Sequence, residues 1–106
     1  MVKFSLLEVS GESCANCLTL LPVVNRLARE RGLPVEHLEV NGENAARVRE
    51  LCIDRVPTLI VFRDGEEIAR CTGYQPEEIL ELWLDAKISQ EGCADMPRNS
   101  VCIPAG

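Results

Sequence analysis

The chain has 106 residues, of which 46% are hydrophobic and 26% charged, so we expect one compact domain with a packed core and no extensive disorder. The formal net charge is −6 and no basic face is concentrated in the sequence, which argues against nucleic acid and against an anionic membrane surface as partners. No stretch has the pattern of a signal peptide or of a membrane span, so we expect a cytoplasmic protein.

The first half of the chain predicts a strand, a long helix and a second strand. Residues 2–10 combine alternation with an apolar run, which predicts a strand covered on both faces. Residues 14–31 carry apolar side chains at spacings of three and four, which indicates an amphipathic helix. Gly32 and Pro34 follow as stop signals, and the alternation in residues 35–40 predicts the second strand.

The second half predicts a short helix, a hairpin and a last helix. The short helix is expected over residues 43–52, with an inner face that consists of Ala45, Val48, Leu51 and Cys52. Residues 57–62 and 66–72 predict two strands joined by a turn of the Asp-Gly type. Residues 75–89 predict an amphipathic helix, and its inward side chains are expected to be Ile79, Leu80, Trp83 and Leu84.

This order of elements, β-α-β-α-β-β-α, predicts an α/β fold with one mixed four-stranded sheet and helices on both faces. The first two strands are joined by a helix and are expected to be parallel, and the last two are expected to form an antiparallel hairpin. Residues 1–90 form one predicted domain. Residues 91–106 have no periodicity and contain two prolines and two cysteines, so we expect an irregular tail.

Cys14 and Cys17 carry the clearest chemical signal. Cys14 falls at the start of a predicted helix, where unpaired backbone N–H groups and the helix dipole favour a thiolate over a thiol. Cys17 lies one turn further on the same side, close enough to form a disulfide with Cys14. Thiol–disulfide exchange needs such an attacking thiolate and a resolving thiol. Half of a zinc site and two structural cysteines stay open as alternatives, although the chain has no second CxxC and one histidine.

Beyond this pair, the sequence resembles the thioredoxin family over residues 2 to about 90. Pro22 lies five residues after Cys17, where the family carries a proline. The segment DRVPTLIVFRDGE, residues 54–66, resembles the family's proline, strand and hairpin turn, and Gly73 precedes a similar last helix. The resemblance implies a thioredoxin-like fold.

The resemblance also implies roles for three residues outside the cysteine pair. Pro57 should be cis and lie opposite the cysteines, and Val56 before it should offer its backbone to an extended substrate. Glu8 lies six residues before Cys14, at the position where the family has a buried acid that exchanges a proton with the resolving cysteine. Glu8 shares a strand face with apolar residues, which is consistent with burial. A solvated charge at the strand end is the alternative.

The sequence departs from the family's pattern at three points. Ser13 replaces the usual tryptophan before the first cysteine, and Ala15 and Asn16 replace Gly-Pro between the two cysteines. The first predicted strand begins at residue 2, so we expect no counterpart of the family's N-terminal strand and helix. Because the dipeptide helps to set the reduction potential, we expect an atypical thioredoxin and do not assume recognition by a standard reductase or by standard targets.

The resemblance implies a protein-disulfide reductase in which Cys14 attacks, Cys17 resolves and Glu8 handles the proton. It implies protein disulfides as substrates, a monomer, no cofactor or metal beyond the dithiol, and a thioredoxin-reductase-type electron donor of the NADPH–flavin or ferredoxin type. The alternative function is a metal or metalloid carrier that uses the CxxC together with cysteines of the tail.

The other cysteines and the histidine are less informative. Cys52 is expected to be a buried small residue, and the sequence does not decide which way Cys71 faces. Cys93 and Cys102 could form a disulfide, supply a further thiol, bind metal or stay free in the tail. His37 is expected to be a surface histidine.

Overall fold

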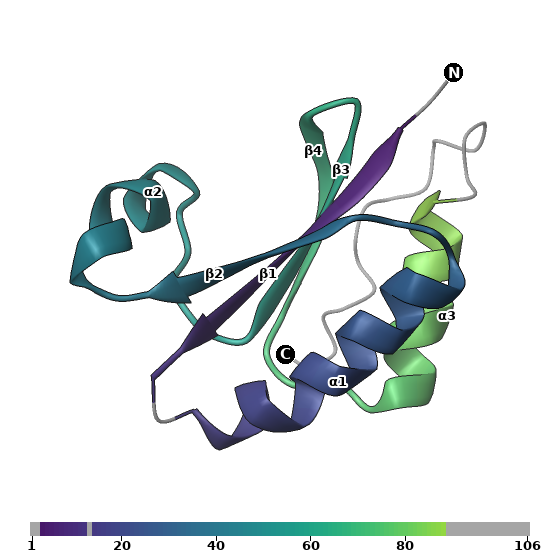
Figure 1. Cartoon of the computed structure of the whole chain (residues 1–106), viewed down its shortest axis with the longest axis horizontal. Coiled ribbons are helices and arrows are strands. Elements are labelled where there is room, and N and C mark those ends of the chain that lie inside the picture. Colours follow the sequence, from purple (N-terminus) through teal and green to yellow (C-terminus); the bar gives the residue numbers. More distant parts are fainter. Residues whose placement is uncertain (1–2, 13, 89–106) are drawn as a thin grey trace.

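The computed structural model describes residues 3–12 and 14–88, which form a four-stranded sheet with helices packed against it (Figure 1). The strands are β1 (Phe4–Gly11), β2 (Val35–Val40), β3 (Thr58–Arg63) and β4 (Glu66–Thr72). The α-helices are α1 (Ala15–Glu30), α2 (Ala45–Glu50) and α3 (Glu77–Ile88), and a short 3-10 helix, η1 (Gly42–Asn44), precedes α2. The predicted order of elements is confirmed. The predicted tail, residues 91–106, lies outside the described residues.

β1 lies inside the sheet, whose strand order is β2-β1-β3-β4. It pairs in parallel with β2 and antiparallel with β3, and β3 pairs antiparallel with β4. This topology confirms the mixed sheet. The parallel register places Glu8 opposite His37 and Ser10 opposite Glu39, so it decides which side chains of β1 and β2 meet.

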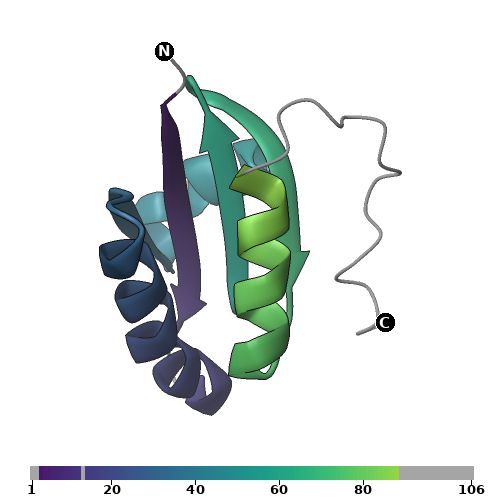
Figure 2. The ribbon, with the colours of Figure 1, turned by 90° about the vertical axis from the view of Figure 1, so that its right-hand side faces the viewer.

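Helices cover both faces of the sheet, as predicted. α1 and α3 lie on one face, and α2 lies on the other (Figures 1 and 2). Leu6 of β1 belongs to the apolar cluster under α1 and α3, whereas Leu7 and Val9 belong to the cluster on the α2 side. Because successive side chains of a strand point to opposite faces, β1 is buried on both of them.

The second helix is shorter than predicted. It ends at Glu50, Leu51 caps it, and Cys52 takes a left-handed backbone conformation with φ 57°. The chain thus leaves the helix before Cys52, whose side chain is exposed, so the predicted burial of Cys52 is wrong. Ala45 is also exposed, whereas Val48 and Leu51 do pack against the cluster on the α2 side.

One predicted inward residue of the last helix also lies elsewhere. Leu80, Trp83 and Leu84 are buried as predicted, but Ile79 is 45% exposed. The buried stripe of α3 follows the spacing of three and four from Leu80 and continues to Ile88, which packs against the same cluster. Ile79 lies at the border of this stripe, so the prediction that it faces inward is wrong.

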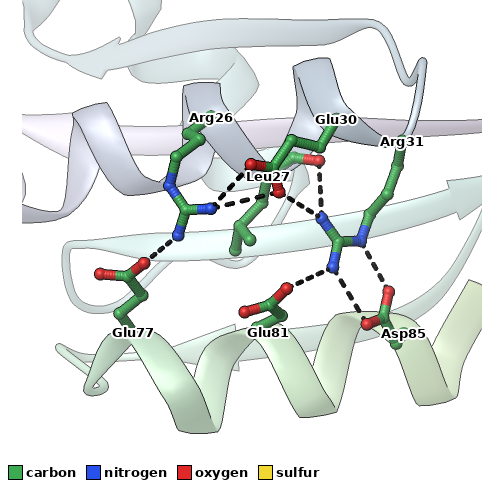
Figure 3. A network of polar contacts seen from close by, with 7 residues as sticks. All are labelled: Arg26, Leu27, Glu30, Arg31, Glu77, Glu81 and Asp85. Atoms are coloured by element: carbon green, nitrogen blue, oxygen red, sulfur yellow. Dashed lines mark hydrogen bonds and ion pairs between the residues drawn. The ribbon is translucent and has the colours of Figure 1, made fainter.

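Ion pairs join the C-terminal half of α1 to α3 (Figure 3). Arg31 follows α1 directly and its side chain is only 15% exposed. Its guanidinium donates to both carboxylate oxygens of Asp85, at 2.6 and 3.0 Å, and to Glu81 at 2.8 Å. It also donates to the C=O of Leu27 at 3.1 Å. These charge-assisted hydrogen bonds fix one helix against the other.

A second arginine extends this contact one turn toward the start of α1. Arg26 donates to Glu30 in its own helix at 3.0 and 3.1 Å, and it also binds Glu77 in the first turn of α3. The network therefore spans the length of α3 that faces α1 (Figure 3).

Replacing Asp85 by Asn is expected to remove an acid-sensitive part of the stability. The hydrogen bonds from Arg31 lower the pKa of the Asp85 carboxyl. The contribution of this pair is therefore present above the ordinary carboxyl pKa and is lost as the pH falls through the lower folded-state value. Because the carboxylate is half-exposed, we expect a loss of about 1 kcal/mol or less at neutral pH, measured by urea unfolding, and a loss that shrinks as the pH falls through the acid range.

The matched control is Glu66→Gln, because Glu66 is exposed and has no ion pair within residues 3–12 and 14–88. Its unfolding free energy should stay parallel to that of the wild type across the acid range. An Asp85→Asn curve that is equally parallel would contradict the assignment.

Candidate active site

Cys14 and Cys17 are joined by a disulfide at the N-terminus of α1. Their Cα atoms are 5.2 Å apart, an ordinary spacing for a disulfide. Cys14 is half-buried, whereas Cys17 is only 3% exposed. The structure thus brings the two predicted cysteines together, with the first sulfur accessible and the second shielded.

The start of α1 supplies the polar surroundings of the first sulfur. Cys14 is the N-cap residue, with an extended backbone at φ −107° and ψ 103°, and its Sγ accepts a hydrogen bond from the Cys17 N–H at 3.1 Å. No acidic residue occupies the first turn of α1. The partial positive charge of this helix end is therefore directed at the sulfur without a carboxylate in that turn to offset it.

The loop before β3 contains the proline that the family resemblance singled out. The Val56-Pro57 peptide bond is cis. The Thr58 hydroxyl donates to the C=O of Arg55 at 2.8 Å, and the Gly73 N–H donates to the C=O of Pro57 at 2.7 Å. These two hydrogen bonds hold the loop from both sides, one within the turn and one from the end of β4.

Gly11, the last residue of β1, lies against this loop. A Cβ at Gly11 would come within 3.1 Å of Val56 Cγ2, so the strand passes the loop at a distance that only glycine permits without a shift. A pocket of about 610 Å³ opens beside them, lined by residues 11–12, 40–42 and 53–56. The cysteine pair and the proline loop therefore lie at the carboxyl ends of β1 and β2, where open α/β sheets bind their ligands.

Glu8 is buried in β1, with 1% of its surface exposed. It shares its strand face with Phe4 and Leu6, which belong to the side covered by α1 and α3. One carboxylate oxygen accepts a hydrogen bond from the Ser10 hydroxyl, and the other lies 3.0 Å from His37 Nδ1. The predicted burial is confirmed. In this disulfide form the carboxylate oxygens are engaged by Ser10 and His37.

The order of these features along the chain is matched by a known family. The family model described as Thioredoxin matches residues 2–86. The chain belongs to the thioredoxin family. A curated thioredoxin of Staphylococcus haemolyticus is 34% identical over 73 residues, which cover 68% of this chain and 70% of that protein.

Solved thioredoxins share the fold. A single-residue variant of thioredoxin from Halobacterium salinarum is 31% identical, with a TM-score of 0.72 over 79% of this chain and 74% of that chain. The short form of thioredoxin f from spinach chloroplasts is 27% identical, with a TM-score of 0.70 over 80% of this chain and 77% of that one. Together with the bonded cysteine pair, this membership supports thiol–disulfide oxidoreductase chemistry.

The remaining cysteines of this thioredoxin-family protein differ in their surroundings. Cys52 is a free, exposed thiol. Cys71 is 3% exposed on the face covered by α1 and α3, and it takes part in a disulfide. Cys93 and Cys102 lie outside the described residues. Within the described part of the chain, no group of three or more His, Cys, Asp or Glu side chains is arranged to hold a metal ion. No helix described there is long and apolar enough to cross a membrane.

Sequence reasoning missed two residues of the site. His37 was expected at the surface without a role, and its side chain is indeed 44% exposed, yet it contacts the buried Glu8. The patterns of the two strands predict that each residue lies in a strand, but the register that makes them neighbours is not contained in either pattern. Gly11 had a weak signal, because a glycine in a strand often marks a close approach of other chain segments.

Replacing Gly11 by Ala is expected to displace Val56 and with it the loop that carries Pro57. The new Cβ would require a shift of a few tenths of an ångström, so we expect a loss of about 1 kcal/mol in unfolding free energy and slower thiol–disulfide exchange. Urea unfolding and a turnover assay would measure both effects.

Gly42→Ala is the matched control, since Gly42 lines the same pocket and a Cβ there would meet nothing within 4 Å. We expect this variant to behave like the wild type. If the two variants had the same stability and turnover, the close approach of Gly11 to Val56 would not matter for either property.

Proposed function

We propose that this protein reduces the disulfides of other proteins, with Cys14 as the attacking thiol and Cys17 as the resolving thiol. The observation that carries this proposal is the disulfide at the N-cap of α1, which joins an accessible sulfur to a shielded one. The Cys17 N–H that now contacts Cys14 Sγ would stabilise a thiolate there after reduction, which makes Cys14 the nucleophile.

The reaction has two exchange steps. The Cys14 thiolate attacks one sulfur of the substrate disulfide, the substrate S–S bond breaks, and the other substrate sulfur leaves as a thiolate. Cys17 then loses its proton and attacks Cys14 Sγ, which releases the second substrate sulfur and forms the Cys14–Cys17 disulfide. Two electrons pass to the substrate, and the dithiol needs no organic cofactor to carry them.

Glu8 is proposed to take the proton of Cys17 in the second step. It is buried in β1 on the sheet face that α1 covers, and Cys17 is buried in the first turn of that helix. A buried carboxylate with few polar neighbours is suited to exchange a proton with a neighbouring thiol, directly or through one water.

Val56 and Pro57 are proposed to receive the substrate backbone. Within the described part of the chain, no hydrogen bond uses the N–H or the C=O of Val56, whereas the C=O of Pro57 is occupied by Gly73. An extended substrate could pair with these open groups as an added strand does. Leu18 beside the cysteines, 73% exposed, and Tyr74 after Gly73, 43% exposed, would offer apolar contacts.

The proposal also covers the electron donor, the oligomeric state and the cellular compartment of the protein. The oxidised pair must be reduced again, for which we propose a thioredoxin-reductase-type donor of the NADPH–flavin or ferredoxin type. The residues next to Cys14 in the sequence, Ser13, Ala15 and Asn16, differ from the family's usual ones, so this donor need not be interchangeable with that of other thioredoxins. We propose a monomer that acts in the cytoplasm.

Cysteine variants test the order of the two exchange steps. Cys14→Ser should abolish reduction of a protein disulfide such as that of insulin, because no nucleophile remains. Cys17→Ser should stop after the first step and accumulate a mixed disulfide through Cys14, visible by mass spectrometry as a covalent adduct. Cys52→Ser should retain turnover. Retained turnover in Cys14→Ser would refute the proposed function.

Alkylation rates test whether the helix start activates Cys14. In the reduced protein at pH 6, iodoacetamide should modify Cys14 roughly ten times faster than Cys52, since the gain in thiolate fraction exceeds the loss of intrinsic nucleophilicity. Cys52 is a fair reference because it is free and exposed in the same molecule. Peptide mapping gives both rates from one reaction, and equal rates would contradict the assignment of Cys14 as the nucleophile.

A further inference from the structure

Glu8 and His37 form a link between the interior and the solvent. They face each other in the parallel pairing of β1 with β2, and Glu8 Oε1 lies 3.0 Å from His37 Nδ1. The Glu8 side chain is 2% exposed, whereas that of His37 is 44% exposed. One end of this hydrogen bond is therefore in the core, and the imidazole at the other end reaches water.

His37 is also the basic side chain that the structure places against Glu8. Within the described residues, Glu8 has no ion pair with a lysine or an arginine. Its second oxygen accepts from the neutral Ser10 hydroxyl. A buried carboxylate is costly unless it is paired and hydrogen-bonded, and His37 is the side chain placed to pair with Glu8.

The other charges near this pair are few. On β2, Glu39 shares the strand face of His37, two residues further along and opposite Ser10. On β3, the residue opposite Glu8 is the apolar Leu59. The first eleven residues of α1 carry no charge. The charged side chains that join α1 to α3 are engaged with one another and are Arg26, Glu30, Arg31, Glu77, Glu81 and Asp85.

We infer that His37 is a positioning residue that passes protons between Glu8 and the solvent during the disulfide cycle. This inference rests on the proposed role of Glu8 toward Cys17. Imidazole is the side chain whose ordinary titration falls near neutrality, and its two nitrogens let it accept a proton at one side and release one at the other.

The proton balance is simple in both directions. When Cys17 is deprotonated, its proton moves to the Glu8 carboxylate, then to His37 Nδ1, and the imidazolium releases a proton from Nε2 to water. When the pair is reduced again, the neutral imidazole takes a proton from water at Nε2, the imidazolium passes its Nδ1 proton to Glu8, and Glu8 supplies it to the leaving Cys17 thiolate. One proton passes in each direction, and no electron passes through His37.

Quenched-flow kinetics with oxidised glutathione test the inference. Mass spectrometry separates the first step, formation of the Cys14–glutathione mixed disulfide, from the second, closure of the Cys14–Cys17 disulfide. His37→Gln keeps a hydrogen-bond donor for Glu8 but does not titrate. We expect it to slow closure about tenfold near neutrality, to leave the first step unchanged and to flatten the pH dependence of closure relative to that measured for the wild type.

Two further variants distinguish proton exchange from a structural effect. In a Glu8→Gln background, His37→Gln should cause no additional slowing, because the group through which it acts is gone. His37→Ala should regain closure when free imidazole is added, since the edge position of β2 leaves space for a soluble base. A solvent-exposed residue on an edge strand should tolerate both changes, and thermal unfolding confirms that each variant is folded.

The inference is overturned if the closure profile of His37→Gln superimposes on that of the wild type, if its slowing persists in full without Glu8, or if Glu8→Gln closes normally. These outcomes are separable from failure of the proposed function. Oxidation of the protein by oxidised glutathione needs only the cysteine pair, whereas the function is tested by reduction of a protein disulfide by the wild type and by Cys14→Ser.

Discussion

The central position of β1 is the constraint on which the site depends. This strand pairs with β2 on one side and β3 on the other and is buried on both faces. Because β1 is held in the core, the position of its carboxyl end is fixed, and three features of the site depend on that position. Gly11 contacts the loop of Val56, Cys14 caps α1 three residues later, and Glu8 is buried earlier in the same strand. A shift of β1 by one residue would exchange its two faces and separate all three.

The N-cap of α1 is a residue that supplies a reactive sulfur but stabilises the start of a helix less than the usual capping residues do. Serine, threonine, aspartate and asparagine are the favoured N-caps, and here the position belongs to Cys14, whose sulfur is a weaker acceptor. The stability of α1 must therefore come from elsewhere. Its buried face supplies the apolar contacts, and Arg31 at the opposite end supplies hydrogen bonds to α3 (Figure 3). The strongest polar contacts of the helix are thus at the end remote from the cysteines.

Much of the fold could be predicted from the sequence, because hydrophobic periodicity reports directly on burial. The strands, the order of elements and the cysteine pair followed from local patterns. The exposure of Cys52 could not be predicted in this way, because a periodic pattern does not show that the backbone takes a left-handed conformation directly after Leu51. The prediction for Ile79 failed for a related reason: an apolar residue fits the pattern of α3 although it lies at the border of the buried stripe and is 45% exposed. The contact of Glu8 with His37 needed the register of two strands, which depends on how the whole sheet packs.

The buried carboxylate and the resolving thiol share an electrostatic constraint. If Glu8 were ionised while Cys17 became a thiolate, two anions would be buried on the same side of the sheet, and like charges in a poorly solvated site oppose each other strongly. Moving the proton of Cys17 onto Glu8 keeps the number of buried negative charges constant during the exchange. That solution works for repeated turnovers only if Glu8 can return its proton to water. In this chain Glu8 lies on the sheet face that α1 and α3 cover, and Leu59 is its neighbour on β3. The remaining side is β2, an edge strand, and the residue of β2 that lies opposite Glu8 is a half-exposed histidine.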